Sequence, residues 1–228
     1  MIIIYKTSKE TQIRKDNKKK HILSAASMIF AERGYAGATV KDIVRKADAS
    51  IGTFYFYFKS KENLFELLYD EFSILLDRVS EYAFDKKVIN DVMGFCRSKV
   101  SELWIFQNNK GIAKAMMIEA AGLNPLFEKK RAEIFRKSND RIERIFEKLK
   151  SQGFKTSYDA KTCALICNGT LYYVITDWLQ GNCQNQLIDY AYPIITYNLN
   201  AFKLEYQEDQ VIQYINEMMA EMEKYFKE

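Results

Sequence analysis

The chain has 228 residues, 48% of them hydrophobic and 28% charged, so it can bury a core and is not disordered throughout. Only two prolines and nine glycines interrupt it, too few for the frequent turns of a β-sandwich or β-barrel. No run of about 18 uncharged apolar residues predicts a membrane span, and the first residues do not resemble a secretory signal. We therefore expect a helical, cytoplasmic protein of one or two domains with no membrane partner.

The formal net charge of +4 is unevenly distributed along the chain. Residues 1–62 hold 13 of the 34 Lys and Arg but only 6 of the 30 Asp and Glu, which leaves 21 and 24 for residues 63–228. The N-terminal part is therefore charged +7 and the rest −3. This asymmetry indicates either a polyanionic partner for the N-terminal part or simply a solvated basic tail.

The first quarter of the chain predicts a basic flexible arm over residues 1–14, followed by short helices. Apolar residues recur at helical spacing from Asp16 to Arg33, and Gly34 then ends that helix because glycine adopts positive φ at no cost. Two helices of about eight residues follow, with Thr39 and Ser50 as N-caps, over residues 39–47 and 51–58. Ser60 caps a longer helix with a buried stripe formed by Leu64, Leu68, Phe72, Leu75 and Val79.

The remainder is also predicted to be helical. Asn124-Pro125 marks the start of a helix. Pro193 either kinks the helix that contains it or marks the residue where that helix begins. A final segment has a heptad-like stripe formed by Val211, Ile215, Met218, Met222 and Tyr225, and it packs either on its own subunit or on a partner. The expected helices after the fourth are 88–107, 110–121, 125–150, 159–180, 186–203 and 208–227.

Two short helices joined by a tight turn have the proportions of a helix-turn-helix motif. A helix of eight residues is about 12 Å long, enough to lie across a DNA major groove of about the same width. Phe54 and Phe58 are expected to face inward, against Ile43 and either Ile29 or Phe30. The outward side is then Thr53, Tyr55, Phe56 and Tyr57, a surface that suits a covering partner better than water.

The segments ILSAASMIFAERGYAGATVKD and IVRKADASIGTFYFYFKSKENLF resemble the DNA-binding domain of TetR/AcrR-type bacterial transcriptional regulators. The resemblance runs without a gap from about Lys19 to Phe65. It implies an all-α homodimer with a three-helix DNA-binding domain (residues 15–60) and a larger ligand-binding and dimerisation domain (61–228). By family analogy, the 159–180 helix and the one after it form a four-helix dimer interface.

By position, the resemblance implies that double-stranded operator DNA is bound by residues of the two short helices and of the next helix start. These residues are Thr39, Lys41, Ser50, Gly52, Thr53, Tyr55, Phe56, Tyr57 and Lys61. Thr39 and Ser50 are also explained as helix caps alone, and Lys41 as a solvated charge. Two positions depart from the family pattern: Asp48 stands where glycine is common, at some conformational cost, and Ile51 where lysine is frequent.

The second domain is expected to bind a small hydrophobic or aromatic effector, such as an acyl chain, in a mostly apolar cavity. The candidate residues are Phe72, Phe95, Cys96, Trp104, Phe106, Met116, Met117, Tyr172, Tyr173 and Trp178. Aromatic and Met residues at helical spacing are more often plain core, and that interpretation stays open. The segments 119–131 and 171–182 resemble parts of these regulators but do not indicate a particular ligand.

Catalysis, a cofactor and a metal site have little support in the sequence. His21 is the sole histidine and lies beside three lysines, and Cys163 and Cys167 form no C-x-x-C pair that would favour zinc. We therefore expect a ligand-responsive transcriptional regulator, a repressor that binds a near-palindromic operator, and not an enzyme. The alternatives are a helical ligand-binding or interaction protein with a degenerate DNA-binding domain, and a small helical enzyme.

Overall fold

The computed structural model describes residues 9–84, 90–119, 122, 124–153, 155–156, 158–181 and 184–226. Within these residues every regular element is helical and no strand is present, so the predicted all-α fold is confirmed. Residues 1–8 of the expected arm and Cys183 lie outside the described residues. The helices, in chain order, are α1 (Lys9–Gly37), α2 (Val40–Lys46), α3 (Ile51–Tyr57), α4 (Lys61–Ala83), α5 (Asp91–Asn108), α6 (Lys110–Lys114), the π-helix η1 (Ala115–Glu119), α7 (Pro125–Ser151), α8 (Ala160–Gln180), the 3₁₀ helix η2 (Leu187–Tyr190), α9 (Ala191–Ala201) and α10 (Glu208–Tyr225).

The first helix differs from its prediction at both ends. It begins at Lys9. Residues 9–14 are therefore helical, and the prediction of a flexible arm is wrong for these residues. The polar sequence there has no apolar periodicity, but Lys, Arg, Gln and Glu are good helix formers. Gly34 has the predicted positive φ, 71°, but the chain turns there and continues helically to Gly37.

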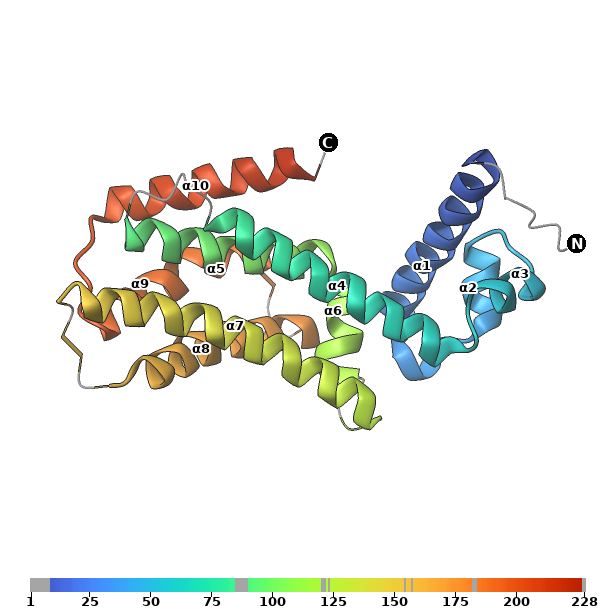
Figure 1. The fold of residues 1–228 in the computed structure, drawn as a ribbon, viewed down its shortest axis with the longest axis horizontal. Coiled ribbons are helices and arrows are strands. Elements are labelled where there is room, and N and C mark those ends of the chain that lie inside the picture. The colour runs from blue at the N-terminus through green and yellow to red at the C-terminus, as the bar shows by residue number, and fades with distance from the viewer. Residues whose placement is uncertain are drawn as a thin grey trace, which may run out of the picture.

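α4 joins the small N-terminal unit of α1, α2 and α3 to the larger helical body (Figure 1). Its first turns pack into the N-terminal unit, where the Phe65 ring centroid lies 5.4 Å from that of Phe30 and 4.6 Å from that of Tyr35. Further along, Phe72, Leu76 and Val79 face the core of the body, close to the predicted stripe. The division at residue 60 stays a prediction, because the same helix packs into both parts.

The body is built from α5 to α10, with α7 packed along α8 and α10 along α5 (Figure 1). The expected helix 110–121 is instead two elements, α6 and the π-helix η1, a difference that local sequence does not signal. Pro193 stands in the first turn of α9, after η2, as one of its two predicted roles requires. No helix among the described residues is long and apolar enough to cross a membrane.

α10 packs on its own subunit, which decides between the two predicted alternatives. Val211, Ile215, Met218 and Met222 are buried as their spacing predicts, whereas Tyr225 remains exposed. The buried guanidinium of Arg97 in α5 donates two hydrogen bonds to the Glu221 carboxylate of α10, at 2.9 and 3.1 Å. The last helix is therefore bound by a paired charge as well as by its apolar stripe.

Candidate DNA-binding surface

The N-terminus of α2 is fixed by a capping box. The Thr39 hydroxyl accepts a hydrogen bond from the Asp42 backbone N–H at 3.2 Å, and the Asp42 carboxylate accepts one from the Thr39 N–H at 3.2 Å. The Thr39 hydroxyl also donates to this carboxylate, a bond that holds the pKa of Asp42 below its usual value, helped by Arg33 and Arg45. The predicted cap is confirmed, and Asp42 additionally ties α2 to α1.

The turn between α2 and α3 accommodates the aspartate that departs from the family pattern. Asp48 has φ 42°, in the left-handed region that aspartate tolerates better than most residues. The Ala49 N–H donates to the Val44 carbonyl at 2.9 Å, which closes the turn. The Lys18 ammonium of α1 donates to the Asp48 carbonyl, also at 2.9 Å. The turn therefore keeps its form without glycine.

Helix α3 has buried aromatic side chains on one face and exposed aromatic side chains on the other. Phe54 and Phe58 are buried, as predicted, whereas Tyr55 and Phe56 are 56% and 67% exposed. Tyr57, expected to face outward, is half-buried. An exposed phenylalanine on a seven-residue helix is costly in water, so this surface suits a macromolecular partner.

Some of the remaining residues predicted to contact DNA are exposed, and others already form hydrogen bonds within the protein. Lys41 and Gly52 are exposed, and a side chain at Gly52 would meet only the Ser50 hydroxyl, at 3.7 Å. Ser50 caps α3 by accepting from the Thr53 N–H at 3.0 Å, and its hydroxyl lies 2.8 Å from that of Thr53. Thr39 and Ser50 are therefore helix caps, and any contact to DNA comes in addition to that role.

Lys61 is held inside the protein rather than extended into solvent. Its ammonium donates to the Tyr35 carbonyl at 2.8 Å and to the Ala38 carbonyl at 3.1 Å, and lies 4.4 Å from the centroid of the Tyr35 ring. Tyr35 lies in the last turn of α1 and Ala38 directly follows it, where backbone acceptors lack helical partners. The sequence missed this structural role, because it depends on a contact across 23 and 26 residues.

The N-terminal unit is also linked to the body at the kink of α1. The Glu119 carboxylate at the end of η1 accepts a hydrogen bond from the Tyr35 N–H, directly after Gly34. Close by, Gly111 of α6 lies so near α1 that an added Cβ would be 2.5 Å from the Ser27 carbonyl oxygen. The body therefore contacts α1 through α6 and η1 as well as through α4.

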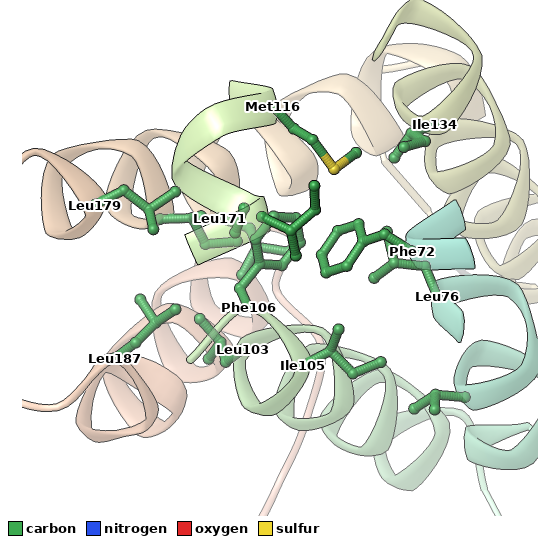
Figure 2. Close-up of a cluster of buried hydrophobic side chains, with 14 of the residues drawn as sticks. Phe72, Leu76, Leu103, Ile105, Phe106, Met116, Ile134, Leu171, Leu179 and Leu187 are labelled. Carbon is green, nitrogen blue, oxygen red and sulfur yellow. The ribbon is translucent and has the colours of Figure 1, made fainter. Parts of the chain in front are cut away.

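The predicted effector residues do not form a single site. Phe72, Phe106 and Met116 converge from α4, α5 and η1 in the apolar cluster of Figure 2, and Tyr172 of α8 lies 6.2 Å from Phe106 between ring centroids. The others lie elsewhere. Trp104 stacks on Phe226, Trp178 donates to the Asn185 carbonyl at 3.0 Å, Tyr173 is 75% exposed, Phe95 is buried near Lys99, and Met117 is half-buried.

Buried polar groups border this cluster, and no sequence pattern indicated them. Lys99 of α5 is fully buried and donates to the Asn168 side chain at 2.9 Å. Glu102, one turn further on, accepts a hydrogen bond from the Ser138 hydroxyl at 3.2 Å, and its second carboxylate oxygen has no hydrogen-bond partner among the described residues. Burial, with Glu102 as a lesser cause, raises the pKa of the Tyr172 hydroxyl.

Neither a metal centre nor a reactive thiol is supported within the described part of the chain. It contains no group of three or more His, Cys, Asp or Glu side chains placed to hold a metal ion. Cys96, Cys163 and Cys167 are buried and unpaired. Burial raises the pKa of Cys96 and Cys167 to about 12, which disfavours the reactive thiolate.

Comparison with known proteins agrees with the geometry of α1 to α3. Residues 22–68 match the sequence model described as "Bacterial regulatory proteins, tetR family". Residues 22–68 therefore form a helix-turn-helix DNA-binding domain of this type.

The similar proteins that match beyond this domain include regulators of fatty acid metabolism. The chain is 25% identical to the fatty acid metabolism regulator protein of Bacillus subtilis over 177 residues, 77% of this chain and 90% of that protein. The fold is similar to that of the fatty acid degradation regulator FadR from Bacillus halodurans (TM-score 0.71, 21% identity, covering 83% of this chain and 97% of that one). It is also similar to FadR from Bacillus subtilis in complex with stearoyl-CoA (TM-score 0.67, 21% identity, 78% and 96%).

Further HTH-type transcriptional regulators of Bacillus subtilis align over shorter stretches of 47 to 78 residues, which is 17% to 38% of their length.

Proposed function

We propose that this chain is a repressor that binds a near-palindromic DNA operator as a homodimer, through α3 of each subunit. The observation that supports this most directly is α3 itself, a capped helix with Tyr55 and Phe56 exposed above a buried aromatic base. Two such helices one duplex turn apart, about 34–36 Å, would occupy successive major grooves. The well-formed turn at Asp48 argues against a degenerate DNA-binding domain, and the protein is proposed not to be an enzyme.

The proposed dimer interface is the outer face of α8 and α9. Leu165, Tyr173 and Tyr197 on this face are 50%, 75% and 61% exposed. Between the helices lies an apolar groove of about 540 Å³, whose lining includes Tyr173, Val174, Pro193 and Tyr197. Apolar exposure of this extent on neighbouring helices is typical of a subunit interface. Replacing Tyr197 by Glu is expected to give monomers in analytical ultracentrifugation, and a dimer unaffected by it would count against this interface.

The proposed effector is a fatty acyl thioester. Two observations support this class. A relative that aligns over 77% of the chain is a fatty acid metabolism regulator, and the apolar cluster of Phe72, Phe106 and Met116 lies between helices of the body. Met116 is an adaptable side chain that can move aside for a chain of methylenes. Such a ligand acts by preferring a conformation in which the two α3 helices no longer match the operator spacing, transmitted through the η1 and α6 contacts to α1.

The test is fluorescence anisotropy with DNA from upstream of the gene, at several salt concentrations. We expect salt-sensitive, specific binding that weakens on addition of palmitoyl-CoA, much less with octanoyl-CoA and not with coenzyme A alone. A Phe56→Ala variant, which leaves the buried base of α3 intact, should lose affinity for this DNA. Absence of specific binding at every tested fragment would refute the DNA-binding proposal, and equal release by coenzyme A alone would refute the acyl ligand.

A further inference from the structure

The N-terminal turns of α1 extend beyond the DNA-binding domain shared with the family. The match to the family begins at residue 22, whereas α1 begins at Lys9. These 13 additional helical residues add about 20 Å to α1. Figure 1 shows them at the same end of the molecule as α3, away from the helical body. The extension carries Arg14, Lys15 and four further lysines, but only two acidic residues, Glu10 and Asp16.

A groove of about 730 Å³ lies between this extension and α3. Its α1 side includes Arg14, Lys15, Asn17, Lys18 and His21, and its α3 side is formed by Tyr57, next to the exposed Phe56. The described residues that line it include no carboxylate. The one acidic residue between Arg14 and Lys18, Asp16, accepts a hydrogen bond from the Gln12 side chain at 3.0 Å, one turn away along α1.

The basic wall of this groove is fixed relative to α3. The Lys18 ammonium donates to the Asp48 carbonyl in the turn that precedes α3, at 2.9 Å. The Lys15 ammonium lies 5.7 Å from the centroid of the Phe56 ring, within the range of a cation–π contact. These two contacts bind the extension to the turn and to the outer face of the helix that would enter the major groove.

We propose that this groove binds the sugar–phosphate backbone of the same duplex that α3 contacts. The inference rests on the proposed function and extends it, because it assigns a sequence-independent part of the affinity to residues outside the helix-turn-helix motif. Cationic side chains next to a polar aromatic hydroxyl suit phosphate oxygens. The groove continues directly into the exposed face of α3, so a duplex seated on Phe56 passes along Arg14 and Lys15.

The salt dependence of binding tests this proposal. The duplexes are one enriched by the wild-type protein from a random pool and a scrambled duplex of the same composition. Each phosphate contact contributes about 0.9 to the slope of log K against log salt concentration. A dimer carries two copies of each residue, so Arg14→Gln and Lys15→Gln are each expected to lower the slope by about 1.8. The loss should be equal for both duplexes, because backbone contacts carry no sequence information.

Lys20 provides a matched control. It belongs to the same basic run but lines a different groove, together with Leu68 and Phe72 of α4. Lys20→Gln removes the same charge and should leave the slope within about 0.5 of wild type. Circular dichroism melts check that each variant is folded. Arg14 is exposed, so Arg14→Gln still tests the groove if Lys15→Gln disturbs the position of Phe56.

Three outcomes would overturn the inference while leaving the proposed function intact. They are an unchanged slope in both groove variants, an equal drop in Lys20→Gln, and a loss restricted to the enriched duplex. A wild-type protein that binds the enriched and scrambled duplexes equally would instead refute the proposed function.

Discussion

Replacing Lys61 by Met removes the ammonium that joins the start of α4 to the end of α1. Its two hydrogen bonds, to the Tyr35 and Ala38 carbonyls, are charge-assisted and lie in a partly buried place. Charged hydrogen bonds contribute about 1.5–3 kcal/mol each when desolvated, and the half-exposure of Lys61 reduces this. We therefore expect the free energy of unfolding to fall by about 2 kcal/mol, which lowers the Tm by about 4–8 °C for a chain of this size.

Urea denaturation measures this loss, with Lys59→Met as the matched control, because Lys59 is exposed in the same connection. The same variant separates the two roles of Lys61 if its DNA binding is measured well below its Tm. A structural role alone leaves the salt slope unchanged, whereas an additional phosphate contact lowers it by about 0.9 per subunit. A Lys61→Met protein within 0.5 kcal/mol of wild type would refute the structural role assigned here.

Three further predictions concern other contacts. Asp42→Asn should destabilise the protein at neutral pH. Because the pKa of Asp42 in the folded protein lies below its ordinary value of 3.8, the difference from wild type should be constant above about pH 3.8 and shrink as the pH falls further. Melts from neutral pH down to well below pH 3.8 measure this, and a pH-independent difference would contradict it. Gly111→Ala places a Cβ 2.6 Å from that of Ala31 and should cost about 1–3 kcal/mol in urea denaturation, unlike Gly37→Ala, whose Cβ meets nothing closer than 3.7 Å. Glu221→Gln leaves the buried Arg97 guanidinium without an anion and should cost roughly 2–4 kcal/mol, with faster hydrogen exchange in α10; unchanged exchange there would show that the pair does not hold the helix.

Local sequence was sufficient for the helix-turn-helix because its determinants lie within a few residues of each other. The Thr39 and Ser50 caps act over three residues, and the four-residue spacing of Phe54 and Phe58 fixes which face of α3 is buried. The left-handed conformation of Asp48 followed from the tolerance of aspartate for positive φ. The same local logic predicted the stripe of α10, except for Tyr225 at the frayed end of the helix.

The features that the sequence did not predict depend on distant contacts. The hydrogen bonds of Lys61 span more than 20 residues, and the contact between Glu119 and Tyr35 spans 84. The burial of Lys99 and Glu102 in α5 depends on partners from α7 and α8, which no local pattern can reveal. The length of α1 was missed for another reason: its first turns have no apolar stripe, and residues 11–14 are exposed.

The contact of α3 with DNA bases is the central claim, and selection from a random duplex pool tests it most directly. The wild-type protein and a Thr53→Ala variant would each be used to enrich binding sequences. We expect wild type to enrich inverted half-sites with centres about one duplex turn apart, and the variant to lose preference at defined base pairs within each half-site while retaining the spacing. Pools without a shared sequence, or the same base preferences for both proteins, would contradict the assignment of α3 as the helix that contacts the bases.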